Sequence, residues 1–271
     1  MGNIIEKIEQ PTSLPIKRVV QENENVKTFY FATRLKSKPG QFVIMWLPRV
    51  DEKPFSIAYD KGDEMGLSVA ILGRFTKKLF TLKAGDLVGI RGPYGTYFSL
   101  KDELKKILLV GGGYGVAPLA TLVEEAINKK IDIDFCNGAR SKKFLLFQER
   151  LKKLKANVYT STDDGTAGVA GTVVDIVTEL LDKNKYDCIY TCGPELMEKK
   201  IVRLAEERSI PCQVSIERYM KCGFGICGQC CIDSSGQRMC LEGPIVSGNF
   251  ALAQEEFGRF HRGASGKKIL F

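Results

Sequence analysis

The first hundred residues alternate apolar and polar positions in short runs that are separated by glycine and proline. Four such runs cover residues 26–33, 40–47, 66–72 and 86–93. An apolar residue at every second position is typical of a strand with one buried face. Because short strands at regular intervals favour a closed sheet, residues 1–100 are predicted to form a small antiparallel β-barrel.

The pattern changes at Lys105, where the chain enters a continuous apolar run. Residues 107–110 read Ile-Leu-Leu-Val, as expected for a parallel strand that is buried on both faces. Strand-like and helix-like segments then alternate at residues 120–129, 131–140, 158–165, 171–181 and 186–197. This alternation predicts an α/β domain with a doubly wound parallel sheet over residues 101–215.

A cysteine-rich loop dominates the remaining segment, residues 216–271. Four of its cysteines follow a C-x4-C-x2-C-x9-C spacing: Cys222, Cys227, Cys230 and Cys240. The first three match the spacing with which plant-type ferredoxins hold a [2Fe–2S] cluster. The loop also contains Gly223, Gly225 and Gly228, where positive φ angles would turn backbone N–H groups toward the sulfurs. We therefore predict a small C-terminal [2Fe–2S] module with these four cysteines as metal ligands.

Two other kinds of cysteine site stay open on the spacing alone. A structural zinc site also uses four cysteines, although zinc sites favour paired C-x2-C units and this loop has one such pair. A disulfide framework fits poorly with a chain that otherwise reads as a cytosolic enzyme. Cys231 is the surplus thiol, and its side chain is expected to point away from that of Cys230, so it is not predicted as a ligand.

Composition and charge narrow the choice of partners. The chain has 271 residues, of which 44% are hydrophobic, and it carries a net charge of +8. This charge indicates a solvated surface that attracts anionic cofactors or an acidic partner, and no motif for nucleic-acid recognition accompanies it. No apolar run reaches about 18 residues, and residues 1–10 lack the apolar core of a signal peptide. We therefore expect no membrane span and a cytoplasmic location.

The glycine-rich turn after residues 107–110 is a candidate nucleotide site. Its glycines are Gly111, Gly112, Gly113 and Gly115, and Pro118 follows. A strand, a glycine-rich turn and a helix N-terminus together bind a dinucleotide pyrophosphate, because the backbone can approach the phosphates and the helix dipole favours their charge. Ligands of such sheets gather at the carboxyl ends of the strands, which also carry residues 138–140, 162–165 and 192–194.

One motif of the predicted barrel and the glycine-rich turn resemble motifs of the ferredoxin-reductase superfamily. The barrel motif is Lys53-Pro54-Phe55-Ser56, and the turn follows the superfamily's G-G-x-G-x-x-P pattern. The resemblance implies that Lys53 neutralises the FAD pyrophosphate, that Phe55 lies against the flavin and that Ser56 reaches flavin N5. Lys53 replaces the usual arginine, so it supplies a point charge in place of a bidentate fork.

The resemblance extends to further positions, grouped by the cofactor they would contact: Ser68, Val69, Ala70, Phe75 and Thr76 for FAD, and Cys192, Gly193 and Pro194 for the nicotinamide of NAD. Residues 75 and 76 correspond to a phosphate-binding Gly-Thr turn, with phenylalanine in place of the glycine. The resemblance also implies catalytic roles for Ser56 and Cys192. A buried cysteine at a strand end is more often inert, and that reading of Cys192 stays open.

The order of the three parts is similar to one branch of this superfamily. Over nearly the whole chain it resembles the electron-transfer subunits of the NAD-linked dihydroorotate dehydrogenases, and residues 161–165, with Asp164 as a cofactor contact, are also similar. The resemblance implies FAD, a [2Fe–2S] cluster and NAD as cofactors. It also implies an FMN-containing dihydroorotate dehydrogenase catalytic subunit as partner, in a two-plus-two heterotetramer of pyrimidine biosynthesis. Electrons would pass from dihydroorotate to FMN, the cluster, FAD and NAD.

Two other functions stay open. The same folds and carriers resemble the subunit of ferredoxin:NADP oxidoreductase, hydrogenase or sulfide-type complexes, and Arg140, Ser141 and Lys142 leave NADP open as the nucleotide. The third possible function is a binding module that a structural zinc ion stabilises and whose nucleotide-binding fold is inactive. His261, the only histidine, is expected at the surface of a polar tail, so the chain is poor in groups for acid–base catalysis.

Overall fold

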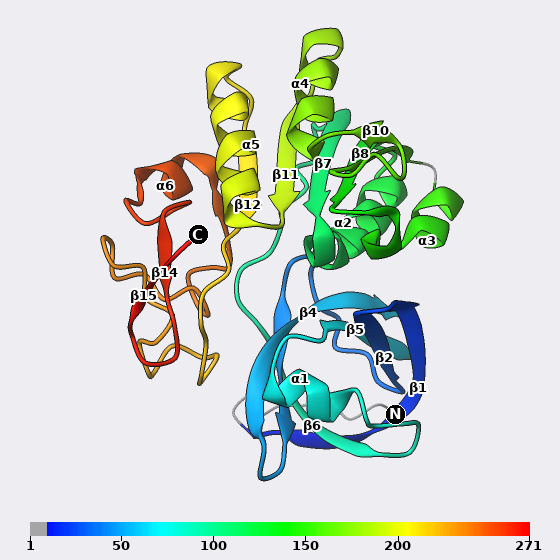
Figure 1. Ribbon diagram of the computed structural model, residues 1–271, viewed down its shortest axis with the longest axis vertical. Coiled ribbons are helices and arrows are strands. Elements are labelled where there is room, and N and C mark those ends of the chain that lie inside the picture. The colour runs from blue at the N-terminus through cyan, green and yellow to red at the C-terminus, as the bar shows by residue number, and fades with distance from the viewer. Residues whose placement is uncertain (1–9, 155) are drawn as a thin grey trace.

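In the computed structural model, which describes residues 10–154 and 156–271, six strands near the N-terminus close into an antiparallel barrel (Figure 1). In barrel order these are β1 (Thr12–Asn23), β2 (Val26–Phe31), β5 (Glu64–Ala70), β4 (Asp51–Lys61), β3 (Phe42–Leu47) and β6 (Leu87–Tyr94). Alternate residues such as Phe29 and Phe31 of β2 are fully buried in the interior. The predicted barrel is confirmed.

Strand β3 is apolar at nearly every position because both of its faces are covered. Val43 and Met45 lie in the barrel interior, whereas Ile44 lies on the outer wall and packs with the C-terminal segment. A Cβ atom at Gly223 of the cysteine-rich loop (residues 222–240) would lie only 2.7 Å from the Ile44 side chain. The loop therefore rests directly on the outer wall of the barrel, where glycine permits the close approach.

A short helix, α1 (Arg74–Leu79), lies between β5 and β6. Phe75 and Thr76, which the resemblance assigns to a phosphate-binding turn, form the first turn of this helix. Thr76 Oγ1 accepts hydrogen bonds from the backbone N–H groups of Leu72 and Gly73 at 2.9 and 3.0 Å. The threonine hydroxyl therefore caps its own helix, because these N–H groups have no partner within the helix.

A seven-stranded sheet follows the barrel and is parallel except at one edge. Its strands lie in the order β10 (Val169–Ala170), β9 (Asn157–Thr162), β8 (Asp132–Ala139), β7 (Lys106–Gly112), β11 (Cys188–Cys192), β12 (Cys212–Ser215) and β13 (Ile245–Ser247). The chain moves outward from β7 through β8 and β9 and then returns to β11 on the other side of β7. The strand order therefore reverses between β7 and β11, and ligands of open α/β sheets bind at such a reversal.

Helices cover both faces of this sheet, as a doubly wound fold requires. Helix α2 (Val116–Asn128) packs on one face, and α4 (Val173–Lys183) and α5 (Glu195–Glu207) pack on the other. Three short helical segments lie in the connections: η1 (Gly113–Gly115), η2 (Lys142–Phe144) and α3 (Gln148–Lys153). Over residues 10–154 and 156–271, no helix is both long and apolar enough to cross a membrane.

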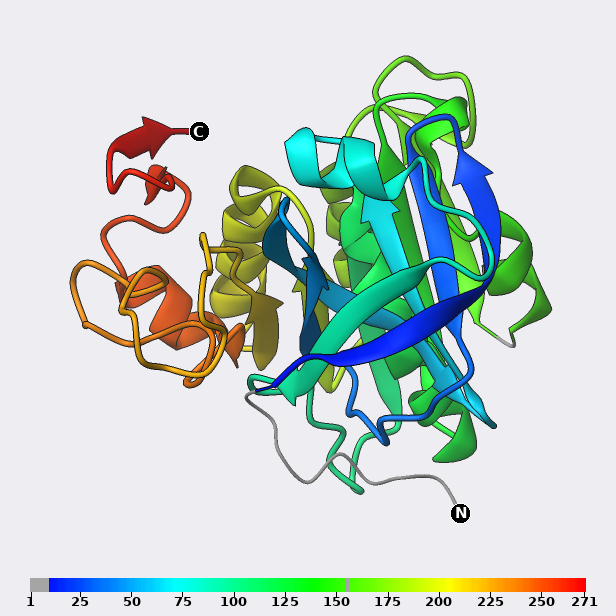
Figure 2. The same ribbon diagram turned by 90° about the horizontal axis from the view of Figure 1, so that it is seen from below.

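The C-terminal segment folds against the sheet and the barrel. Its elements are β13, α6 (Gly248–Ala253), β14 (Phe260–Arg262) and β15 (Lys268–Leu270). Strand β13 pairs antiparallel with β12, so residues on both sides of the predicted boundary at 215/216 share one sheet. The rest of the segment, coloured orange to red in Figures 1 and 2, lies beside this edge of the sheet.

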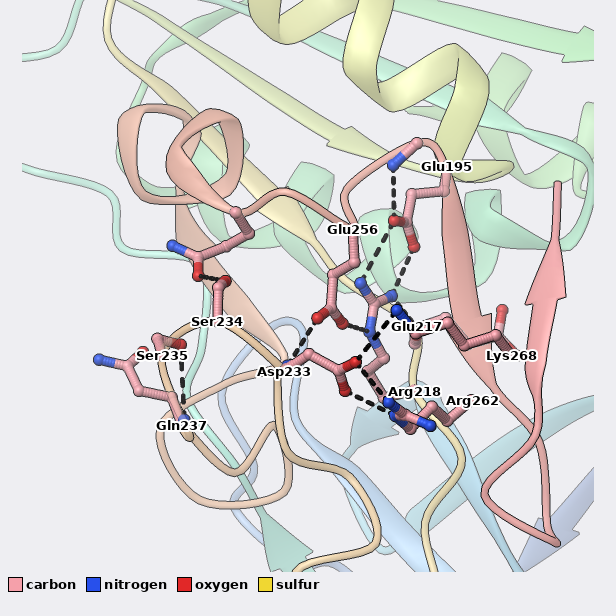
Figure 3. A network of polar contacts seen from close by, with 12 residues as sticks. Glu195, Glu217, Arg218, Asp233, Ser234, Ser235, Gln237, Glu256, Arg262 and Lys268 are labelled. Atoms are coloured by element: carbon pink, nitrogen blue, oxygen red, sulfur yellow. Dashed lines mark hydrogen bonds and ion pairs between the residues drawn. The ribbon is translucent and has the colours of Figure 1, made fainter.

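A buried arginine holds the C-terminal segment to the α/β domain (Figure 3). Arg218 is 5% exposed and lies between two buried carboxylates. Its Nη1 donates to Glu195 Oε2 at 2.6 Å, and its Nε donates to Glu256 Oε1 at 3.1 Å. The other oxygen of Glu256 accepts from the backbone N–H of Asp233 at 2.6 Å. A continuous chain of charge-assisted hydrogen bonds therefore joins the start of α5 to the cysteine-rich loop.

Replacing Arg218 by methionine should destabilise the folded protein by about 3–5 kcal/mol, because removing one partner of a buried ion pair leaves an uncompensated charge. Thermal unfolding, followed by circular dichroism, measures the loss. Arg259→Met is the matched control, since Arg259 pairs with Glu255 at the exposed surface at 3.1 Å, where an ion pair contributes about 0–1 kcal/mol. Equal stability of the two variants would contradict the role assigned to Arg218.

Candidate functional site

The four predicted metal ligands meet within the cysteine-rich loop as two pairs. The backbone N–H of Cys227 donates to Cys222 Sγ at 3.5 Å, and that of Cys240 donates to Cys230 Sγ at 3.4 Å. The side chains within each pair also interact with one another. The three glycines of the loop have the expected positive φ angles, which are 82° at Gly223, 86° at Gly225 and 69° at Gly228.

This donor set fits an iron–sulfur cluster. Burial alone would raise the pKa of the Cys222 thiol, but hydrogen bonds from the N–H groups of Cys227 and Phe224 lower that pKa to about 6. The thiolate is the form that binds a metal. All nine cysteines lie in the described part of the chain and are free thiols, so they form no disulfide framework. Within the described residues, no three Cys, His, Asp or Glu side chains converge on a single metal ion.

Cys231 lies outside the two pairs. Its backbone forms an isolated bridge with Arg238, and its side chain is half-buried. Burial raises the pKa of the Cys231 thiol, and a negative charge on neighbouring Cys230 raises it further. The pairing of the other four cysteines leaves Cys231 as the surplus thiol, and its exclusion from the ligand set stays a prediction.

Arg91 joins the cysteine-rich loop to the barrel, and sequence reasoning assigned it no role. Its side chain is almost fully buried at the outer wall of β6. Its Nη2 donates to Glu52 Oε1 at 2.8 Å, and its Nη1 donates to the carbonyl oxygen of Cys222. The guanidinium carbon lies 5.7 and 5.2 Å from the ring centroids of Tyr94 and Phe224. A charged residue inside an otherwise apolar strand is the signal that marks such a buried, paired arginine.

The predicted flavin motif of β4 lies next to the segment that enters the loop. Lys53 Nζ is 2.6 Å from Asp51 Oδ2 and 3.4 Å from the hydroxyl oxygen of Tyr219. Phe55 stacks on Phe75 of α1 with ring centroids 5.8 Å apart. Because side chains two residues apart share one face of a strand, the cation of Lys53 and the ring of Phe55 can serve the same ligand.

Other predicted flavin contacts are used within the protein. The hydroxyl oxygens of Ser68 and Thr28 are 2.7 Å apart and hydrogen-bonded. The Val69 side chain is fully buried in the barrel interior, so only its backbone can contact a ligand outside. Thr76 caps α1, as described above, so its hydroxyl is hydrogen-bonded within the protein. Ser56 is half-buried on β4, opposite Phe42 of β3.

Two turns meet where the strand order of the sheet reverses. One is the glycine-rich turn after β7, and the other is the 192–194 turn after β11. A Cβ atom at Gly115 would overlap the carbonyl oxygen of Cys192, and one at Gly112 would lie 2.8 Å from Pro194. Because Gly112 and Gly115 have no side chain, the backbones of the two turns can touch. The sequence suggests instead that these glycines contact a phosphate.

Within the glycine-rich turn, Gly113 is the glycine that faces open space. Its φ angle is 56°, and a Cβ atom there would meet no other atom within 4 Å. It lies directly before the first residues of α2, whose dipole favours an anion. In contrast, a Cβ atom at Gly111 would lie 2.7 Å from Val116. The phosphate-binding role predicted for the cluster of glycines therefore fits Gly113 best.

Two side chains that sequence reasoning missed complete this site. Tyr114 of the glycine-rich turn is 51% exposed, and Glu217, which follows β12, is exposed as well. The negative charge of Glu217 raises the pKa of the Tyr114 hydroxyl to about 12. Burial raises the pKa of the Cys192 thiol, and the charges of Glu198 and Glu217 raise it further. Cys192 is therefore a neutral thiol, suited to contact a ring but not to act as a nucleophile.

The loops after β8 and β9 are joined through Thr166. Its hydroxyl donates to Asp164 Oδ1 at 2.6 Å and accepts from the backbone N–H of Lys142 at 2.8 Å. Its oxygen also lies 3.2 Å from the Ser141 hydroxyl. Asp164, predicted as a cofactor contact, is thus an exposed carboxylate that orders its own loop, and the exposed guanidinium of Arg140 lies at the same edge of the sheet.

His261 is not the solvated surface residue that the sequence suggests. It is half-buried in β14, and its ring centroid is 4.9 Å from that of Phe271. Its Nδ1 is buried and has no hydrogen-bond partner within the described residues. The tail folds back as the hairpin β14–β15, which brings Phe271 against His261.

Two parts of the chain match known protein families. Residues 217–250 match the iron–sulfur cluster binding domain of dihydroorotate dehydrogenase B. Residues 109–203 match the oxidoreductase NAD-binding domain. The first match contains all four paired cysteines, and the second contains both turns at the reversal of the sheet.

Similar proteins cover nearly the whole chain. A probable dihydroorotate dehydrogenase B (NAD(+)) electron transfer subunit of Methanocaldococcus jannaschii is 47% identical over 97% of this chain and all of its own length. That of Methanothermobacter thermautotrophicus is 43% identical over 98% of this chain and 99% of its own length.

Solved structures share the fold. A chain of an NADH-dependent reduced ferredoxin-NADP oxidoreductase is 28% identical, covers 87% of this chain and 88% of its own length, and has a TM-score of 0.80. The cytochrome b5 reductase domain of Ulva prolifera nitrate reductase is 17% identical over 71% of this chain and 90% of its own length, with a TM-score of 0.61, and shows the fold alone. On the identity and coverage of its relatives, the chain belongs to the family of electron-transfer subunits of NAD-dependent dihydroorotate dehydrogenase B, and it is an oxidoreductase subunit with an FAD/NAD-binding fold and an iron–sulfur cluster binding module.

Proposed function

We propose that this chain carries electrons from an FMN-containing catalytic subunit through a [2Fe–2S] cluster and FAD to NAD+, in a cytoplasmic heterotetramer with two copies of each subunit. The observation that carries the proposal is the packing of the cysteine-rich loop on the barrel wall, beside the β4 motif. Arg91 contacts Cys222, and Lys53 contacts Tyr219, which precedes the loop by three residues. Electrons can therefore pass between the loop and the barrel without crossing the α/β domain.

The pairing of the cysteines supports a two-iron cluster. Cys222 and Cys227 form one pair, and Cys230 and Cys240 form the other. Two pairs suit a [2Fe–2S] cluster, in which four thiolates are divided between two irons. A zinc ion instead needs all four sulfurs about 2.3 Å from a single point.

The outer wall of β4 and α1 supports FAD binding. Lys53 would neutralise the pyrophosphate, Phe55 would lie against the flavin, and Ser56 would face flavin N5. The stacking of Phe55 on Phe75 holds the first ring in place, which reduces the entropy lost when a ligand packs on it. When bound, FAD converts between the hydride chemistry of NAD and the single electrons of a cluster.

The reversal between β7 and β11 supports NAD binding. The backbone of Gly113 and the start of α2 would hold the pyrophosphate, while the nicotinamide would lie beside Cys192, Gly193 and Pro194. Gly112 and Gly115 shape this site by allowing the contact between its two turns. Gly111 packs closely on Val116, and Pro118 is a buried residue near the start of α2. Asp164 would contact the nucleotide from the loop after β9.

The rim of the cysteine-rich loop is the surface where the catalytic subunit would dock. Cys227 is exposed, and neighbouring Ile226 is 78% exposed. Leu241, also exposed, lies 3.1 Å from a Cβ position at Gly225, the residue before Ile226. Exposed apolar groups beside a redox site are suited to be covered by an electron-transfer partner.

A second candidate function is a place in a reductase that exchanges electrons between ferredoxin and NADP. It is favoured by the 28% identity and TM-score of 0.80 with the ferredoxin-NADP oxidoreductase chain. The two functions differ in the partner that supplies electrons to the cysteine-rich loop. Purification of the chain from its source with its bound partner, followed by mass spectrometry, distinguishes them.

The purified single chain, loaded with its cofactors, should reduce an artificial dye with NADH but should not oxidise dihydroorotate. Hydride transfer to a flavin needs correct stacking, whereas oxidation of dihydroorotate also needs a positioned base, and the only histidine packs against Phe271 in the tail. Dye reduction with each substrate, alone and with the FMN subunit added, tests this. A dihydroorotate-driven rate comparable to the NADH-driven one would overturn the assignment.

Lys53→Ala should weaken FAD binding at least tenfold, because a charge-assisted contact to phosphate contributes roughly 1.5–3 kcal/mol. Lys53→Arg should bind FAD as well as the parent. Lys77→Ala is a control, since Lys77 is an exposed cation on nearby α1. Fluorescence titration of the apoprotein with FAD gives the dissociation constants. Unchanged affinity in Lys53→Ala would place the pyrophosphate elsewhere.

Cys231→Ser should retain the full iron content and visible spectrum of the parent, because Cys231 lies outside both thiol pairs. Cys230→Ser should lose most of the iron, because it breaks the pair with Cys240. Iron analysis of the two purified variants compares neighbouring positions in the same loop. The reverse pattern would show that the wrong neighbour is assigned as a ligand.

A further inference from the structure

A buried carboxyl group that the proposed electron path does not use lies directly behind the 192–194 turn. Glu198, near the start of α5, is 1% exposed. Its Oε1 accepts a hydrogen bond from the backbone N–H of Gly193 at 3.0 Å. Its Oε2 is buried and has no hydrogen-bond partner within the part of the chain that the structure describes. An unpartnered, buried carboxyl oxygen is costly to keep charged.

The surroundings of Glu198 supply no cation for it alone. The titratable groups that face it are Glu195, Glu217, Arg218, Cys192 and Cys212. The guanidinium of Arg218 is hydrogen-bonded to Glu195 and Glu256, not to Glu198. Burial raises the pKa of Glu198 well above its usual range, and the charges of Glu195 and Glu217 raise it further. The carboxyl group of Glu198 is therefore harder to ionise than that of an exposed glutamate.

The 192–194 turn is held on two sides. The N–H of Gly193 donates to Glu198 on one side, and the glycine-rich turn contacts the turn on the other. A Cβ atom at Gly193 would lie 3.0 Å from the backbone of Gly112, so the two turns have no room to shift toward each other. We propose that Glu198 is a positioning residue: it holds the 192–194 turn against the glycine-rich turn and so fixes the surface on which the nicotinamide lies. This inference rests on the nicotinamide site proposed above.

A neutral acid suits this position better than a carboxylate. The nicotinamide ring is positive in NAD+ and uncharged in NADH. A buried negative charge behind the turn would hold the oxidised form more tightly and retard the exchange of one for the other. The protonated acid accepts the Gly193 N–H without adding that charge.

The protonation state is tested without any nucleotide. The folded protein binds a proton at Glu198 more tightly than the unfolded chain does, so its stability falls as pH rises above the ordinary carboxyl pKa of about 4.3. Glu198→Gln keeps the shape and the acceptor oxygen but has no proton to lose. Its melting temperature should exceed that of the parent by about 5 °C more at pH 8 than at pH 5.5. Parallel pH profiles of parent and variant would overturn the inference.

The positioning role is tested with Glu198→Leu, which removes the acceptor for Gly193. Hydrogen exchange of residues 190–197 should accelerate, and the dissociation constant for NADH should rise roughly tenfold, while Glu198→Gln stays within about twofold of the parent. Glu206→Gln, an exposed position on the same helix, is the control and should match the parent. The FAD spectrum should be the same in all variants, because the barrel is untouched.

The outcomes separate this inference from the site on which it rests. Unchanged exchange with unchanged NADH binding in Glu198→Leu overturns the inference and leaves the nicotinamide site standing. Faster exchange with unchanged NADH binding overturns both, because the nicotinamide then does not lie on this turn. NADH binding as weak in Glu198→Gln as in Glu198→Leu also overturns the inference, because the charged form would then be needed. If Glu198→Leu does not fold, the pH profile of Glu198→Gln decides.

Discussion

The guanidinium of Arg218 is the interaction on which the arrangement of the three parts depends. It lies where the start of α5, the segment that enters the cysteine-rich loop and the turn after α6 meet, and it is hydrogen-bonded to Glu195 and Glu256. All three side chains are almost fully buried. Removing such charges from water is costly, and complete hydrogen bonding within the group offsets that cost. A different packing of the loop would leave at least one buried charge unpaired.

Two buried glutamates, Glu195 and Glu256, share the guanidinium of Arg218, and a third glutamate beside the 192–194 turn does not contact it. Glu195 and Glu256 are balanced by Arg218, whereas Glu198, three residues further along α5 than Glu195, receives only one backbone N–H group. Two of the buried carboxyl groups therefore have a cation as hydrogen-bond partner, whereas burial raises the pKa of the third, Glu198. The position of the Arg218 guanidinium thus decides which carboxyl groups near the turn after β11 have a cation as partner.

The barrel, the sheet and the iron–sulfur module were predictable because each leaves a local or periodic trace in the sequence. The alternation around Phe29 and Phe31 marks a strand, and the spacing of the first three cysteines reflects one tight loop. Strand β13 and the hairpin β14–β15 were not predictable, because three-residue strands have no period and β13 pairs with a distant segment. Long-range pairing, not propensity, decides β13.

The direction and the burial of individual side chains could also not be predicted from the sequence. A resemblance identifies the positions of Ser68 and Val69, but the structure turns Val69 into the barrel and pairs Ser68 with Thr28. Charged residues give no local sign of burial either. Arg91 reaches the carbonyl group of a residue 131 positions away, and that contact exists only once the loop has packed on the barrel.

The double burial of β3 makes the barrel and the cluster site interdependent. Val43 and Met45 belong to the barrel core, while Ile44, one residue from each, forms the apolar wall beneath the cysteine-rich loop. The apolar shell around a cluster controls its exposure to solvent and, through that, its reduction potential. Ile44 closes the shell on one side, and exposed Ile226 and Leu241 leave it open on the other. A partner that covered these two side chains would complete the shell, and exclusion of solvent in this way shifts the potential of a cluster.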